Sequence, residues 1–202
     1  MRHYIFTLIL IAFMPFTAAA SGNLYTLDPT QTKVKFATKM CEADILEGEF
    51  QDVTGTFYFD ETAPEKSWVE VTIVPASTVY SRDFHRDDHI KTIIDGEKLL
   101  NIKDFPLITF KSTDVKVTGE TTADVTGLLT LVGESHPMTL EITFHKDVGE
   151  SMAGRQLAAF SAYGTFNRSD FNVLYGLDRI GIRRMGNEVM VLINTAGKLQ
   201  SK

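Results

Sequence analysis

Residues 138–144 read Met138-Thr139-Leu140-Glu141-Ile142-Thr143-Phe144, and this heptapeptide decides the fold class. Its apolar and polar side chains alternate at every position. Successive side chains of a β-strand point to opposite faces of a sheet, so the alternation predicts a strand with one buried face and one solvated face. We expect Leu140, Ile142 and Phe144 to point inward, with Glu141 and Thr143 on the outside. A shift of one residue in register would invert this whole set.

The same alternation recurs on both sides of this segment. It is found at residues 33–36, 56–59, 69–73, 108–110, 160–166 and 189–193. Turn signals separate the runs, among them Asp28-Pro29, Gly133-Glu134 and Met185-Gly186-Asn187. About eight strands at hairpin spacing predict an all-β antiparallel fold, either a closed barrel or a sandwich. Residues 82–103 lack alternation, and we interpret them as a helical or irregular excursion between two strands.

The inward faces of these strands are rich in phenylalanine. From the alternation we expect the following side chains to point into the interior: Phe36, Phe57, Phe59, Ile73, Phe110, Leu140, Ile142, Phe144, Phe160 and Phe166. Aromatic side chains fill volume and bury well, so the set is compatible with a filled core. A barrel of about eight strands can also hold one ligand. The alternation alone does not decide between a filled and a hollow interior.

The first 20 residues have the features of a signal peptide. Arg2 provides a positive start, residues 4–16 form an apolar run, and Ala18-Ala19-Ala20 supplies the small residues of a cleavage site. The run is shorter than the roughly 20 residues that a transmembrane helix needs. We therefore expect cleavage after Ala20, export of the chain, and one mature domain over residues 21–202 that is not an integral membrane protein.

The charge and the cysteine content narrow the classes of partner. The formal net charge is −6, and it becomes −7 when Arg2, the only charged residue of the first 20, is removed. Binding of nucleic acid requires a basic stripe, so we expect no nucleic-acid partner. Cys41 is the only cysteine, which excludes an intramolecular disulfide. We interpret it as a small, half-buried apolar side chain rather than a nucleophile or an intermolecular bridge.

The chain offers few candidates for catalysis or metal binding. His85 and His89 are four residues apart and would share a helix face, but Arg86 stands where a zinc protease has its general base. We favour a solvated, ion-paired turn there. Residues 133–137 begin like the nucleophile elbow of a hydrolase, but Pro137 replaces the second glycine of that motif. We therefore expect no enzymatic activity, no catalytic residues, no required cofactor and no metal.

A series of short motifs, taken in order, resembles the YceI-like family. Residues 25–29 open the mature chain, residues 86–90 look like the family's Arg-Asp-x-His-Leu element, and residues 105–112, 125–133 and 160–171 follow. The resemblance covers residues 25–197. It implies an eight-stranded, lipocalin-like antiparallel barrel in the bacterial periplasm. It also implies that the barrel binds a long isoprenoid chain, either a polyprenyl compound or the tail of an isoprenoid quinone.

The resemblance implies a hollow interior in which the ten apolar residues contact the ligand. We expect the polar mouth of this interior in two non-alternating segments that match polar motifs of the family, at Arg86, Asp87, His89, Arg168 and Asp170. Arginine can donate several hydrogen bonds to a polar head group. The alternative is a structural ion pair between Arg168 and Asp87. Asn172 departs from the family pattern, because this position is usually glycine.

The leading interpretation is thus a periplasmic carrier of an isoprenoid lipid. One alternative is a barrel enzyme that acts on a lipid or a quinone, with Asp87, His89 and Arg168 at the reactive site. Another is a periplasmic module that binds haem or a metal through His85 and His89. The sequence leaves open the identity of the lipid and its head group, and whether the chain forms a homodimer.

Overall fold

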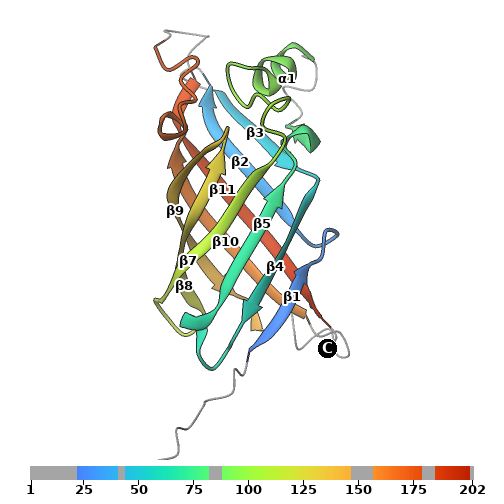
Figure 1. Cartoon of the computed structure of the whole chain (residues 1–202), viewed down its shortest axis with the longest axis vertical. Helices are drawn as coiled ribbons and strands as arrows, with labels where there is room; N and C mark the ends of the chain where they lie inside the picture. Colours follow the sequence, from blue (N-terminus) through green and yellow to red (C-terminus); the bar gives the residue numbers. More distant parts are fainter. Residues whose placement is uncertain (1–21, 41–43, 82–87, 147–156, 179–184, 201–202) are drawn as a thin grey trace, which may run out of the picture.

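The computed structural model describes residues 22–40, 44–81, 88–146, 157–178 and 185–200 (Figure 1). Its strands are β1 (Asn23–Leu27), β2 (Lys33–Met40), β3 (Asp44–Phe50), β4 (Val53–Phe59), β5 (Trp68–Ile73), β6 (Thr78–Tyr80), β7 (Ile108–Val117), β8 (Thr122–Leu131), β9 (Glu134–Phe144), β10 (Leu157–Asn167) and β11 (Met185–Leu199). The helix α1 (Asp88–Asp95) and three 3-10 helices, η1 (Pro64–Lys66), η2 (Pro75–Ser77) and η3 (Arg168–Phe171), complete the described part. The predicted signal peptide, residues 1–20, lies outside it. No helix among the described residues is long and apolar enough to cross a membrane.

The strands occupy eight positions around a closed barrel. The ring runs β1-β4-β5-β7-β8-β9-β10-β11, which is eight strands, and the pairing of β1 with β11 closes it. Three of these positions hold a second strand farther along the barrel axis. There β2, β3 and β6 pair in the same order as β1, β4 and β5, and each continues the corresponding strand. Along one edge β11 pairs with β1 through residues 197–199 and with β2 through residues 185–194. Each of the first three positions is therefore one strand interrupted once, and the sheet is a closed antiparallel barrel rather than a sandwich.

Polar side chains hold the chain at these interruptions. Between β1 and β2, the Asp28 carboxylate accepts hydrogen bonds from the backbone N–H of Thr30 at 3.0 Å and from its hydroxyl at 2.7 Å. Between β3 and β4, the Ser77 hydroxyl accepts from the N–H of Gln51 at 3.1 Å and of Asp52 at 2.9 Å. Backbone groups that lack a strand partner need such acceptors. The breaks are thus defined turns within continuous strand positions.

The predicted alternation is confirmed in β9. Leu140 is 5% exposed, whereas Glu141 beside it is exposed. One predicted turn is wrong, because residues 185–187 belong to β11 rather than to a loop. The register of β11 against β2 shifts between Met185 and Val189, which is the mark of a bulge. A bulge at a Gly-Asn pair gives the same local signal as a turn, and this explains the error.

The excursion predicted at residues 82–103 contains α1, which lies over one end of the barrel (Figure 1). Ile94 near the end of α1 and Leu99 after it are 5% and 4% exposed and join the core. We call this end, which α1 and η3 cover, the helical end. The opposite end carries the turn between β7 and β8, residues 118–121, and we call it the hairpin end.

Candidate functional site: an apolar cavity along the barrel

A cavity of about 330 Å³ lies inside the barrel. Its wall includes inward-facing side chains from every position of the ring, and it reaches from Ile94 and Leu99 at the helical end to Val117 and Glu120 at the hairpin end. The volume falls within the roughly 300–1,000 Å³ that is typical of ligand pockets. The interior is thus hollow, as the resemblance implied.

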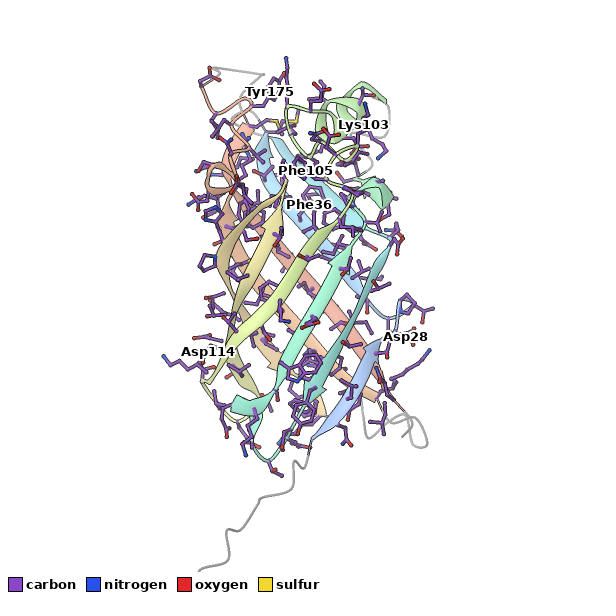
Figure 2. The ribbon with its side chains drawn as sticks, in the orientation of Figure 1. Asp28, Phe36, Lys103, Phe105, Asp114 and Tyr175 are labelled. Atoms are coloured by element: carbon purple, nitrogen blue, oxygen red, sulfur yellow. The ribbon has the colours of Figure 1, made fainter. Side chains whose placement is uncertain are left out.

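All ten side chains predicted to face the interior line this cavity. They are Phe36, Phe57, Phe59, Ile73, Phe110, Leu140, Ile142, Phe144, Phe160 and Phe166. The hairpin half contains a cluster of phenylalanine rings, in which the ring centroids of Phe59 and Phe144 are 4.7 Å apart and those of Phe144 and Phe160 are 5.2 Å apart. Phe36 lies toward the helical end (Figure 2). Contact of these residues with a ligand stays a prediction.

Two glycines explain how so many aromatic rings leave space in the middle. A Cβ atom on Gly127 would lie 2.5 Å from the Phe110 ring, and one on Gly197 would lie 2.3 Å from the Phe57 ring. Contacts this close are excluded for real side chains, so each ring occupies the volume that a side chain at the glycine position would fill. Glycine in a strand often marks such close approach. The rings therefore lie against the wall of the barrel.

The helical end of the cavity is closed by apolar residues. Ile94, Leu99 and Val173 line it and are each at most 5% exposed. Phe171 of η3 is 1% exposed and packs edge-on against Phe166, with ring centroids 5.3 Å apart. Little of this end is accessible to water in the part of the chain that the structure describes.

Arg168, the first residue of η3, lines the same end but is turned toward the backbone. Its Nε donates to the carbonyl of Gly186 at 2.7 Å, its Nη1 to that of Val173 at 2.7 Å, and its Nη2 to that of Met185 at 3.2 Å. The side chain is 4% exposed, and burial lowers the pKa of its guanidinium below the ordinary value. Arginine nevertheless stays protonated in proteins. The three bonds join η3 to the following loop and to the bulge of β11.

The other residues predicted for the polar mouth are not brought together with Arg168 by any described contact. Arg86 and Asp87 lie outside the described residues, as do His85 and Cys41. His89 lies in α1, but its side chain is not described. Asp170 is exposed, outside the cavity lining, and accepts a hydrogen bond from the Ser169 hydroxyl at 3.5 Å. The assignment of these residues to a ligand stays a prediction.

The hairpin end is polar and exposed, and sequence reasoning did not single out its residues. Glu61, Glu120 and Lys146 line the cavity here, with side chains 62%, 88% and 41% exposed. Trp68 and Val117 also line it and are 40% and 46% exposed. The only available signal was that each lies in a turn or at a strand end, a property shared with many surface residues.

An ion-paired lysine spans the hairpin end. Lys146 follows β9, and its Nζ lies 3.5 Å from Glu120 Oε1 and 3.8 Å from Glu61 Oε1. Glu61 follows β4, and β4 and β9 are the second and sixth of the eight strands in the ring, so they stand on opposite sides of the barrel. The Lys146–Glu61 pair therefore crosses the opening. Of the charged side chains in the described lining, three are in this group, and the fourth is Arg168.

No group of three or more histidine, cysteine, aspartate or glutamate side chains within the described ranges is placed to hold a metal ion.

The fold and the cavity define a class of protein, the closed eight-stranded antiparallel barrel with an elongated apolar interior. A model of the YceI-like domain matches residues 25–196. The chain therefore belongs to the YceI-like family.

The chain is similar to several bacterial proteins of this family. A UPF0312 protein of Pseudomonas putida (strain W619) is 40% identical over 128 residues, which is 63% of this chain and 64% of that protein. The chain thus spans less than two thirds of the length of this relative. Protein YceI of Salmonella newport (strain SL254) is 33% identical over 195 residues, which covers 96% of both chains.

Solved structures show the same fold. BcnA of Burkholderia cenocepacia superposes with a TM-score of 0.71 at 23% identity and covers 84% of this chain and 98% of BcnA. A protein of Saccharophagus degradans, described as a polyisoprenoid binding domain, superposes with a TM-score of 0.61 at 12% identity, over 87% and 98% of the two chains. At these identities the likeness establishes the architecture, and it confirms the predicted barrel.

Proposed function

We propose that this protein is a periplasmic carrier that holds a long isoprenoid lipid, a polyprenyl compound or an isoprenoid quinone, inside its barrel without making or breaking bonds. One observation carries the proposal: the apolar cavity runs along the barrel from the helical end to the hairpin end. An elongated apolar ligand matches this shape. The description of the Saccharophagus degradans neighbour as a polyisoprenoid binding domain supports the same class of ligand.

The hydrophobic effect is sufficient to hold such a ligand. Each buried methylene group contributes roughly 0.8 kcal/mol, so about 15 buried carbon groups contribute roughly 12 kcal/mol. Loss of translational freedom and ordering of the chain cost about 4–15 kcal/mol. The two terms are of similar size, and long chains should therefore bind well while short ones bind poorly.

Native mass spectrometry of protein purified from a periplasmic extract tests this function. We expect a mass increment that organic extraction removes and that matches a prenyl lipid. The extracted protein should then rebind long prenyl alcohols more tightly than short ones. Recovery of the protein with no bound lipid and no affinity for prenyl chains would contradict the proposal. Chemical turnover of the added lipid would instead support the enzyme alternative, and a bound metal or haem would support the third interpretation.

A further inference from the structure

We propose that the lipid lies with an uncharged polar head group at the hairpin end, beside Lys146, and that it enters and leaves there. The inference rests on the proposed function and adds the orientation of the ligand, its mouth and its head-group class. It competes with the prediction that places the polar mouth at the opposite end, near Arg168 and Asp170.

The helical end offers little to a polar head group. A polar group that is buried without hydrogen-bond partners costs free energy, so the head needs either water or polar side chains. The apolar residues Ile94, Leu99 and Val173 close this end and are nearly inaccessible. Arg168 already donates from each of its three nitrogen atoms to a backbone carbonyl. The end is suited to the apolar tip of the tail.

The hairpin end offers both water and polar partners. Glu61, Glu120 and Lys146 line the cavity and are all substantially exposed, so a head group between them stays hydrated. Immediately inside this rim lie Phe59 and Phe144, which can pack against a ring or a prenyl unit. In the described part of the chain, the cavity therefore has exposed charged side chains at the hairpin end only, since Arg168 at the other end is buried.

The charges at this rim favour an uncharged head. Two carboxylates and one ammonium give a formal charge of −1, and the ammonium of Lys146 contacts both carboxylates. A phosphate or diphosphate would face two like charges and would have to take Lys146 from its partners. A hydroxyl requires only hydrogen bonds, because it can donate to a carboxylate and accept from the ammonium or from water. A quinone carbonyl only accepts, and the ammonium and water can both donate to it.

Trp68, the only tryptophan of the chain, provides a built-in probe of the head-group position, because it lines the hairpin end. Quinone rings quench tryptophan fluorescence at short range. We expect a benzoquinone with a farnesyl tail to quench Trp68 strongly in delipidated protein, and farnesol, which has the same tail, to leave its fluorescence largely unquenched. Native mass spectrometry of the same samples measures binding independently.

The matched control is the double variant W68F/Y175W, which moves the single tryptophan to the helical end, where Tyr175 lies (Figure 2). We expect weak quenching in this variant at equal occupancy. Strong quenching in the variant, or equal quenching in both proteins, would overturn the inference while leaving the proposed function intact. Absence of binding in the mass spectra would overturn the proposed function, and this inference with it.

Two further measurements test the head-group class and the mouth. Farnesol should bind at least tenfold more tightly than farnesyl phosphate, and tighter binding of the phosphate would overturn the assignment of an uncharged head. Removal of the ion pairs in K146M should speed release of the bound lipid about fivefold, since exposed pairs are individually weak. The control K111M removes an exposed pair of Lys111 with Glu70, 2.6 Å long, from the outer wall. Equal release rates in K146M and K111M would show that the lipid does not pass Lys146.

Discussion

Filling the cavity from its wall should eliminate lipid binding and leave the barrel folded. Ala162 lines the cavity in the middle of β10, between Ile142 of β9 and Ile193 of β11. The substitution Ala162→Phe places a phenyl ring in the path of the ligand. A ring of this size occupies a cavity on the order of 150 Å³, a large part of the 330 Å³ present.

The expected loss of affinity follows from the burial that the lipid forfeits. If the ring displaces about four carbon groups, binding loses about 3 kcal/mol, or roughly two orders of magnitude in Kd. The melting temperature should change by less than about 3 °C, because the ring enters empty space. In a filled core the same ring would lower the free energy of unfolding by about 1–3 kcal/mol through overpacking, and each kcal/mol would lower the melting temperature by about 2–4 °C.

Calorimetric titration of the delipidated protein with a long prenyl alcohol, together with a thermal melt, measures both effects. Thr165→Phe is the matched control, because it adds the same ring to an exposed position of β10. It should change neither quantity appreciably. Unaltered lipid affinity in Ala162→Phe would refute the assignment of the interior as the binding site. A large fall in its melting temperature would refute the hollow interior.

Substitutions at three further positions test what the structure implies about stability, and each is measured by thermal unfolding. Arg168→Ala leaves three backbone carbonyls without their donor, so we expect the free energy of unfolding to fall by about 3–5 kcal/mol and the melting temperature by about 10 °C. The folded fraction should retain its lipid. Loss of lipid at unchanged stability would instead support a role of Arg168 in the mouth. The Asp28 pKa is lowered to about 2, first by the hydrogen bond with Lys198 and then by that with Thr30, so the Asp28 charge stabilises the fold above pH 4 and this contribution disappears as the pH falls through 2. Asp28→Asn should therefore be less stable than the wild type at pH 7 and equally stable near pH 2. A stability difference that does not depend on pH would contradict the assignment. Asn172 has a φ of +59°, so Asn172→Ala should lower the free energy of unfolding by about 1 kcal/mol. Asn172→Gly should leave it almost unchanged, because glycine has no Cβ penalty at positive φ. Equal effects of the two substitutions would show that another contact of Asn172 matters more.

The barrel and the composition of its wall could be predicted from the sequence because both depend on local alternation. The pattern around Leu140 and Glu141 fixes which face is buried, and the same rule applied along the chain identified ten residues that line one cavity. Asn172 illustrates a second local rule, since the position at which the resemblance implied glycine has a left-handed backbone.

The ends of the cavity could not be predicted in this way, because they depend on which loops meet across the ring. Glu61 and Lys146 are separated by 85 positions in the sequence, and only the closure of the barrel brings their charges to 3.8 Å. Arg168 was recognised as a special residue, but its partners are the carbonyls of a loop and of a bulge that the sequence presented as a turn. Hollowness also depends on tertiary structure, since it requires the Phe110 ring to lie over Gly127.

The division between wall and rim bears on how such a barrel can be selective. Apolar burial scales with the number of buried carbons and does not distinguish one prenyl chain from another of equal length. Discrimination must therefore come from the few polar groups that a bound lipid can reach. In the described lining the charged groups are Arg168, which is bonded to the backbone, and the Glu61, Glu120 and Lys146 group at the hairpin end. Substitutions in the wall should consequently alter affinity for all prenyl chains alike, whereas substitutions at this rim should alter the preference among head groups.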